Sequence, residues 1–213
     1  MVELIRGLDA RVIAQNLETV RERVGEGVQI LAAVKYIATE ELGVLAEAGV
    51  TLVGENRAQA LAEKHAAHGG AFTWDFIGHL QSRKVRDIVP LTRLIHSVSS
   101  DSALAQLARH GTPDTKLLIE VNVAQERGKS GVAPGALAAT LAEAAEAGLT
   151  VTGLMTMPPL AADPEDNRRW FAALAALAAE HGLPELSMGT SQDYAVAAQE
   201  GATIVRVGST LYR

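Results

Sequence analysis

Short apolar runs alternate with helix-like segments along the whole sequence, and this alternation limits the possible folds more than any other feature. The runs are continuous rather than alternating in polarity, which is typical of strands buried on both faces. Strands are predicted over residues 28–34, 51–53, 74–77, 94–98, 116–123, 151–155, 185–188 and 203–207. Helices are predicted over residues 8–24, 40–48, 55–68, 79–89, 101–110, 134–147, 165–181 and 191–200. Strands that alternate with helices run in parallel and are joined by helical crossovers.

The eight predicted strands favour an α/β fold, a closed (β/α)₈ barrel of the TIM type with an extra N-terminal helix over residues 8–24. A length of 213 residues lies near the lower limit for this barrel. We therefore expect residues 1–213 to form a single domain with few insertions. A doubly wound open sheet is the alternative that the alternation leaves open.

The composition excludes several classes of function. The formal net charge of −6 predicts no nucleic-acid partner, because nucleic acids bind to basic faces. The chain has no cysteine, which excludes disulfides and thiolate nucleophiles, and its six histidines lack the HxxxH and HExxH spacings of metal sites. No stretch approaches the ~20 apolar residues of a membrane span, and no signal peptide is evident. We expect a cytoplasmic protein with no metal and no membrane contact.

Lys35 directly follows the first predicted strand, where Ala and Val residues would surround its aliphatic stem. A lysine partly removed from water has a lowered pKa and is nucleophilic at neutral pH. Such an amine forms an imine with an aldehyde. The alternative is that the Lys35 side chain only extends into solvent from the strand end.

Two glycine-containing loops follow the last two predicted strands, at Gly189-Thr190-Ser191 and Gly208-Ser209-Thr210. Glycine lets backbone N–H groups approach an anion closely, and the loops after strands seven and eight are a frequent phosphate site in this fold. The sequence therefore indicates a phosphate site. The alternative is that Ser191 only caps the last helix.

Arg206 interrupts the apolar run of residues 203–207. Burial of a guanidinium is costly unless it has a partner. A ligand acceptor such as a pyridine nitrogen or a carboxylate would serve, and an internal ion pair with Glu55 or Glu120 is the alternative.

Seven short motifs, taken together, resemble the pyridoxal 5′-phosphate (PLP) homeostasis proteins, the YggS or proline synthetase co-transcribed family. That family is similar to the N-terminal barrel of alanine racemase, and the resemblance spans nearly the whole chain. In chain order, the motifs are Val34-Lys35, Gly54-Glu55-Asn56, residues 76–81, Lys129-Ser130-Gly131, Gly153-Leu154-Met155, residues 186–191 and residues 205–209.

The resemblance implies that Lys35 forms a Schiff base with PLP and that Arg206 faces the pyridine nitrogen. It also implies the other cofactor-binding residues: Ser191 with the backbone of Gly208 and Ser209 at the phosphate, and Asn56, His79 and Met188 beside the ring. The sequence departs from the family at Tyr36, where a small hydroxyl residue is common, and at Ser209, where threonine is common.

A guanidinium facing the ring nitrogen keeps that nitrogen unprotonated, which weakens the ring as an electron sink. Racemisation also needs a second acid or base on the opposite face of the substrate. In the racemases that this chain resembles, a separate β domain supplies that group, and this sequence ends soon after its eighth predicted strand. We therefore predict a carrier and regulator of PLP and amino-acid pools without robust turnover.

Three alternatives remain at this point. One is a PLP-dependent, racemase-like enzyme of low activity that uses Tyr36 or a partner chain as the second base. The others are a cofactor-free aldolase that uses Lys35, and a barrel that only contacts other proteins. The partners expected are PLP, amino acids and PLP-dependent apoenzymes, and the protein is expected to be a monomer or weak dimer.

Overall fold

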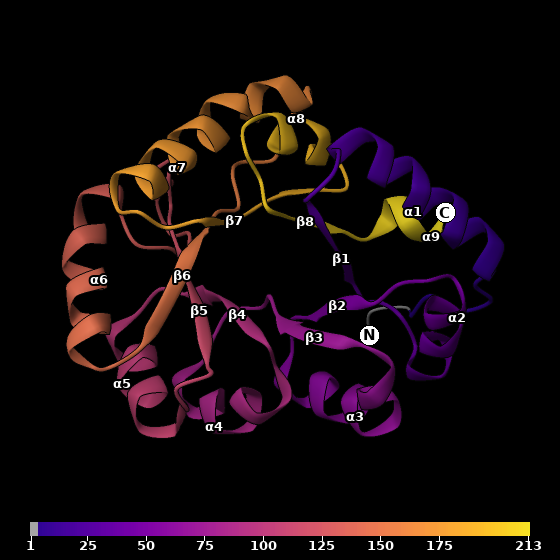
Figure 1. Cartoon of the computed structure of the whole chain (residues 1–213), viewed down its shortest axis with the longest axis horizontal. Helices are drawn as coiled ribbons and strands as arrows, with labels where there is room; N and C mark the ends of the chain where they lie inside the picture. The colour runs from indigo at the N-terminus through magenta and orange to yellow at the C-terminus, as the bar shows by residue number, and fades with distance from the viewer. Residues whose placement is uncertain (1–3) are drawn as a thin grey trace.

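A computed structural model describes residues 4–213 of the chain. Its eight parallel strands close into one barrel in sequence order, with β8 pairing to β1 through Leu31 and Arg206 (Figure 1). The (β/α)₈ prediction is therefore confirmed, and the open sheet is wrong. The strands are β1 (Gln29–Ala33), β2 (Leu52–Glu55), β3 (Thr73–Phe76), β4 (Leu94–Val98), β5 (Lys116–Glu120), β6 (Thr150–Met155), β7 (Glu185–Thr190) and β8 (Ile204–Val207).

Helices surround the barrel and cover its outer face (Figure 1). They are α1 (Ala10–Val24), α2 (Leu42–Glu47), α3 (Ala58–His68), α4 (Val85–Ile88), α5 (Asp101–His110), α6 (Leu137–Glu146), α7 (Arg168–Glu180), α8 (Tyr194–Gln199) and α9 (Ser209–Tyr212). The predicted extra helix is α1, which packs against α8 and α9 beside the seam between β1 and β8. The sequence did not predict α9.

Several helices are shorter than predicted because 3₁₀ turns replace their ends, and one further turn, Gly69–Ala71, follows the end of α3. These turns lie at Thr39–Glu41, Gly69–Ala71, Ser82–Lys84, Val89–Leu91, Pro134–Ala136 and Pro164–Asn167. Two of the turns begin at a proline, which suits a first turn because it donates no backbone hydrogen bond. None of the helices within residues 4–213 has the length and apolar character that crossing a membrane requires.

The apolar core has two parts. The larger part lies between the barrel and the helices, and its fully buried members include Phe76 and Phe171. A smaller cluster, which lies inside the barrel, consists of Leu31, Leu52, Leu94, Leu118, Met155 and Ile204. Side chains alternate between the two faces along each strand, so six of the strands contribute to both parts, whereas β3 and β7 contribute apolar residues only to the larger one.

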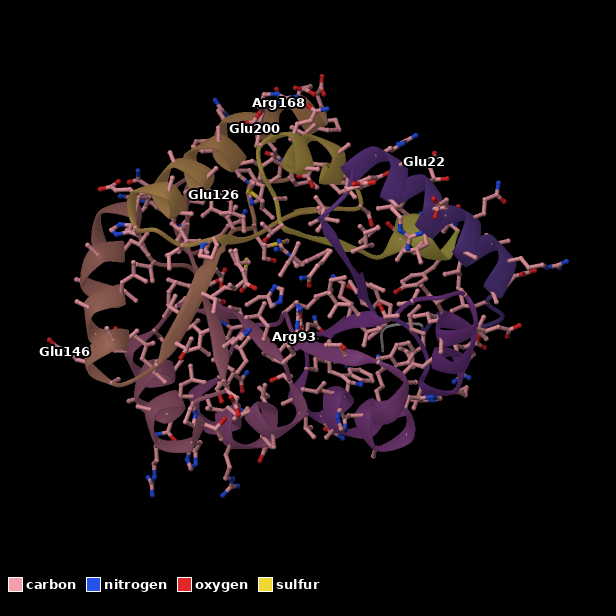
Figure 2. The ribbon with its side chains drawn as sticks, viewed as in Figure 1. Glu22, Arg93, Glu126, Glu146, Arg168 and Glu200 are labelled. Carbon is pink, nitrogen blue, oxygen red and sulfur yellow. The ribbon has the colours of Figure 1, made fainter. Side chains whose placement is uncertain are left out.

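Charged side chains lie mostly on the outside of the ring of helices. Figure 2 shows Glu22 on α1 and Glu146 on α6 pointing away from the barrel, whereas Arg93 lies near its centre. Arg168 joins α7 to the end of α8 through an ion pair with Glu200 at 2.6 Å. The inward position of Arg93 indicates that the barrel interior is not purely apolar.

Candidate functional site

A cavity of ≈ 650 Å³ opens at the carboxyl ends of the strands. This is the end of a (β/α)₈ barrel at which chemistry takes place. The cavity brings together seven of the eight residues predicted for the site. They are Lys35, Asn56, His79, Ser191, Arg206, Gly208 and Ser209.

Lys35 lies in the turn that follows β1, beside the aromatic ring of Tyr36. Its Nζ atom is 4.8 Å from the centre of that ring, which is a cation–π contact. Within residues 4–213, no carboxylate lies within ion-pair distance of Lys35. The amine is therefore available to a ligand in the cavity, and the departure from the family at Tyr36 places a phenol next to it.

Two contacts fix the backbone before Lys35. The carbonyl of Ala33 accepts a hydrogen bond from Tyr212 Oη at 3.3 Å, and the carbonyl of Val34 accepts one from Lys64 Nζ at 2.6 Å. Both carbonyls lie at the end of β1, so these bonds hold the turn that carries the amine. The sequence analysis missed Lys64, which shares the inward face of α3 with buried Leu61. Their i, i+3 spacing was a usable signal.

The buried carboxylate of Glu55 is the ion-pair partner of Lys64, with Nζ and Oε2 2.6 Å apart. Its Oε1 atom accepts hydrogen bonds from the backbone N–H groups of Asn56 at 2.7 Å and Arg57 at 3.2 Å. The suggested pairing of Glu55 with Arg206 is therefore wrong. The Lys64–Glu55 pair instead connects the end of β1 to the start of the loop that carries Asn56.

The loops after β7 and β8 are joined by Ser191. Its Oγ atom accepts hydrogen bonds from the backbone N–H groups of Gly208 at 2.9 Å and Thr210 at 3.4 Å. The suggestion that Ser191 caps the helix predicted over residues 191–200 is wrong, because that helix, α8, begins at Tyr194 and Asp193 precedes it. These two N–H groups are thus already paired. The two loops form one side of the cavity, where their hydroxyls and remaining backbone N–H groups can donate to an anion.

Gly189, at the end of β7, is required by the geometry of this region. Its φ of 87° lies in the left-handed region, and a Cβ atom there would lie 2.5 Å from the Cβ of Ala197 on α8. Only glycine therefore lets α8 pack this closely behind the loop of Ser191.

Arg206 is buried at the base of the cavity, with 6% of the residue exposed. Its Nη1 atom donates to Ser187 Oγ at 2.5 Å, and its Nη2 atom donates to the Thr156 carbonyl and to Met157 Sδ, each at 2.9 Å. Burial lowers the pKa of Arg206 to about 10, although the charges of Asp193 and Glu120 act in the opposite direction. The guanidinium thus stays charged at neutral pH.

Glu120, the other suggested partner of Arg206, instead accepts a hydrogen bond from Ser130 Oγ at 2.6 Å. Within residues 4–213, no carboxylate lies within ion-pair distance of Arg206. The suggestion of an internal ion pair is therefore wrong for both glutamates. The positive charge of Arg206 faces a cavity that could hold an acceptor from a ligand.

Met188 lies elsewhere, although the sequence analysis placed it beside the ring. It is fully buried in the larger apolar cluster and does not line the cavity. The residue before it, Ser187, contacts Arg206 inside the barrel. Side chains of consecutive strand residues point to opposite faces, so Met188 faces the surrounding helices instead. Its predicted place beside a ligand does not fit the structure.

Asn56 gives an independent sign of a ligand. It lines the cavity, and its Oδ1 atom is buried without a hydrogen-bond partner within residues 4–213. Buried polar atoms in native proteins nearly always have a partner. A polar ligand in the cavity would supply one.

The chain is similar to several known proteins. Residues 8–213 match the family described as the alanine racemase N-terminal domain. The pyridoxal phosphate homeostasis protein of Aquifex aeolicus (strain VF5) is 35% identical over 214 residues, covering 94% of each chain. The structure of PipY from Synechococcus elongatus PCC7942 without PLP has a TM-score of 0.87 at 32% identity, over 94% of this chain and 100% of that one.

A second PipY structure, with PLP bound, has a TM-score of 0.83 at 31% identity, over 94% of this chain and 100% of that one. Alanine racemase from Corynebacterium glutamicum shares the fold, with a TM-score of 0.76 at 20% identity, over 96% of this chain and 61% of that one. The resemblance predicted from the seven motifs is confirmed. The chain belongs to the family of pyridoxal phosphate homeostasis proteins, which is built on the barrel of the alanine racemase N-terminal domain.

Proposed function

We propose that this protein binds PLP in the cavity as a Schiff base on Lys35 and acts as a carrier and regulator of PLP and amino-acid pools. One observation carries the proposal. Lys35, Arg206 and the loops joined by Ser191 line the same cavity. An amine, a fixed cation and a group of N–H donors suit the aldehyde, the ring nitrogen and the phosphate of PLP, respectively.

The cavity also fits a ligand of this size and polarity. Its volume of ≈ 650 Å³ lies within the usual range for small-ligand sites, about 300–1,000 Å³. The orphaned Oδ1 atom of Asn56 supplies a further polar contact. The printed name of the Aquifex relative and the PLP-bound structure of PipY support the same ligand.

Arg206 favours a carrier over an enzyme. PLP supplies an aldehyde and an electron-withdrawing ring when it is bound. A guanidinium only donates hydrogen bonds, so Arg206 holds a facing ring nitrogen unprotonated. This makes the ring a weaker electron sink than a carboxylate partner would. Lys35 then holds the ligand, and the loops of Ser191 anchor its phosphate, without strong support for carbanion chemistry.

Tyr36 favours a second candidate function, a racemase-like activity of low rate. Its ring lies 4.8 Å from the amine of Lys35 and is partly exposed at the cavity. A phenol there is a candidate acid or base for a substrate held on Lys35. Incubation of the PLP-loaded protein with single amino-acid enantiomers distinguishes the two functions. Turnover on the order of 1 s⁻¹ or faster, an ordinary enzymatic rate, would overturn the carrier.

The site is tested by adding PLP to the protein, reducing with borohydride and mapping the labelled peptide. We expect the label on Lys35, and we expect Lys35→Ala to abolish it while leaving part of the non-covalent affinity to the loops of Ser191. Lys129→Ala is the matched control, because Lys129 pairs with Glu126 and does not line the cavity. Equal labelling of Lys129 in the wild-type protein would show that the assignment to Lys35 is wrong.

A further inference from the structure

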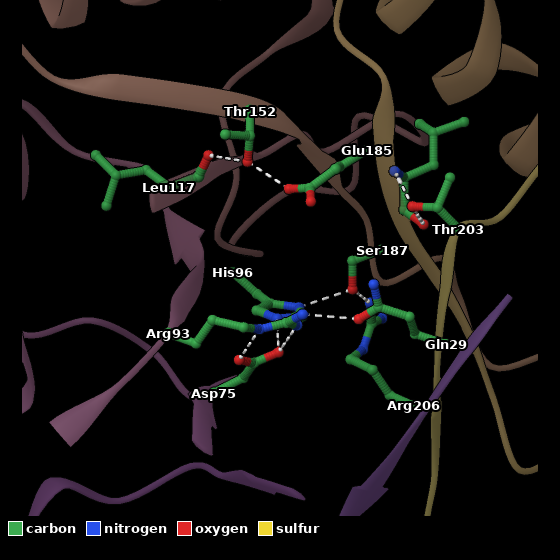
Figure 3. A network of polar contacts seen from close by, with 11 residues as sticks. Gln29, Asp75, Arg93, His96, Leu117, Thr152, Glu185, Ser187, Thr203 and Arg206 are labelled. Atoms are coloured by element: carbon green, nitrogen blue, oxygen red, sulfur yellow. Dashed lines mark hydrogen bonds and ion pairs between the residues drawn. The ribbon is translucent and has the colours of Figure 1, made fainter. Parts of the chain in front are cut away.

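A line of polar side chains crosses the inside of the barrel. It includes Asp75 on β3, His96 on β4 and Ser187 on β7, which are fully buried and do not line the cavity. The line ends at Arg206 on β8 (Figure 3). His96 Nε2 is 3.0 Å from Asp75 Oδ2, and His96 Nδ1 is 2.8 Å from Ser187 Oγ. Ser187 Oγ is in turn 2.5 Å from Arg206 Nη1.

The chemistry of the two ends fixes the direction of every bond in this line. Arg206 can only donate, so Ser187 Oγ accepts from it and uses its own proton toward His96 Nδ1. His96 Nδ1 is then an acceptor, and the ring proton is on Nε2, where it is donated to Asp75. Each group therefore donates to the next one along the line from Arg206 to Asp75. Every atom in the line has the one donor or acceptor role that its partners require.

The far end of the line is anchored by Arg93. Its Nε and Nη2 atoms donate to the two carboxylate oxygens of Asp75 at 3.0 and 2.6 Å. Its Nη1 atom donates to Gln29 Oε1 at 2.8 Å. Two-point binding by a guanidinium fixes the orientation of a carboxylate. Asp75 is thus held in one position, from which it orients His96.

The surroundings of His96 favour, in their net effect, its neutral form. Burial is the largest effect and lowers the pKa of His96, and the positive charges of Arg206 and Arg93 act in the same direction. The carboxylate of Asp75 opposes them. A neutral ring has one donor and one acceptor nitrogen, which is what the line of bonds requires.

The line also restricts which atoms of Arg206 remain for a ligand. Nη2 is occupied by the Thr156 carbonyl and Met157 Sδ, and one N–H of Nη1 is occupied by Ser187. Within residues 4–213, the other N–H of Nη1 and the Nε–H have no protein acceptor. Without Ser187, Nη1 would lose the contact that fixes its direction.

We infer that Asp75, His96 and Ser187 are positioning residues that hold the guanidinium of Arg206 in the orientation required to bind PLP. None of the three lines the cavity, so they act through Arg206 and not by touching the ligand. This inference rests on the proposed function, because it assigns a role within the same site.

A double-mutant cycle tests the inference. Ser187→Ala is expected to weaken PLP binding about tenfold, the value of one hydrogen bond to a charged group. It should also shift the absorption band of bound PLP. In an Arg206→Met background, the same substitution should have no further effect on either quantity. Equal losses in both backgrounds, or no loss in the wild-type background, would overturn the inference.

Thr152→Val is the matched control. Thr152 hydrogen-bonds to Glu185 inside the same barrel, and none of the contacts in Figure 3 connects this pair to Arg206. Loss of the Thr152–Glu185 hydrogen bond should lower the free energy of unfolding and leave the affinity for PLP unchanged. A PLP affinity reduced as much by Thr152→Val as by Ser187→Ala would also overturn the inference.

A measurement on the ligand-free wild-type protein is independent of PLP and of any variant. The ¹⁵N chemical shifts of His96 at pH 7 should show a bare Nδ1 and a protonated Nε2. The opposite tautomer, or a ring protonated on both nitrogens, would disprove the line of bonds. Failure of the wild-type protein to bind PLP would instead refute the proposed function, so the two failures are distinguishable.

Discussion

Lys64 shows how a buried ion pair can position a neighbouring reactive group. Its amine contacts both the Val34 carbonyl and the Glu55 carboxylate, each at 2.6 Å. The first contact holds the turn of Lys35, and the second holds the loop of Asn56 through the backbone bond that Glu55 accepts. At the scale of single residues, the site therefore depends on side chains that do not line the cavity.

We expect Lys64→Met to lower the free energy of unfolding by about 3–5 kcal/mol, because it leaves the Glu55 carboxylate buried without its partner. The double variant Glu55→Gln/Lys64→Met should recover part of this loss, since no charge is then buried. Urea denaturation measures both. Lys84→Met is the control, because Lys84 forms an exposed pair with Asp87 at 3.6 Å and should change stability little. A loss no larger than that of the control would contradict a structural role for Lys64.

At the scale of single helices and strands, the pattern of apolar and polar residues was enough to predict where most elements lie. All eight strands lie where apolar runs predicted them, because a strand covered on both faces must be apolar throughout. Their ends differ by a few residues: β7 extends to Thr190, so Gly189 lies in the strand and not after it. The end of a strand is set by pairing with its neighbours, as in the irregular register between Ser187 and Thr190 opposite β8.

The short helix α2 offers a prediction at this scale. Gly43 lies within it, and a Cβ atom there would have nothing within 4 Å. Gly43→Ala should therefore raise the free energy of unfolding by about 0.5–1 kcal/mol, because alanine loses less backbone entropy in a helix. Thermal unfolding measures the change. Gly49→Ala is the contrasting variant and should destabilise, because the φ of Gly49 is 85°. Stabilisation by both substitutions would show that backbone conformation is not the cause.

At the scale of the whole molecule, barrel closure creates contacts that no local pattern reveals. Seven of the eight predicted site residues line the cavity because chemistry at strand ends is visible in the local sequence. The interruption of apolar runs by Asp75, His96 and Ser187 was a usable signal for polar residues in the interior. Their mutual contacts depend on which face of each strand turns inward, and that follows from pairing around the complete barrel. Met188 was misplaced for the same reason.

The buried His96 makes the stability of the whole fold depend on pH. In the unfolded chain its pKa has the ordinary value of 6.5, whereas burial lowers its pKa in the folded protein. The unfolded state thus binds more protons as the pH falls below 6.5, so the free energy of unfolding should decrease from that pH downward to the folded-state pKa. We expect His96→Gln to remove this contribution, which amounts to at most about 1.4 kcal/mol per pH unit. Denaturation midpoints measured from pH 7.5 to 5 provide the test, and identical slopes for the two proteins would contradict it.

The seam between β1 and β8 brings the beginning and the end of the chain to one site. Lys35 follows the first strand and Arg206 lies in the last, so neither half of the polypeptide carries a complete pocket. During synthesis on the ribosome, Lys35 is made early, whereas Arg206 is made only after nearly all of the other residues. The ligand can therefore bind only after synthesis is nearly complete, and its binding indicates that β8 has paired with β1 to close the barrel.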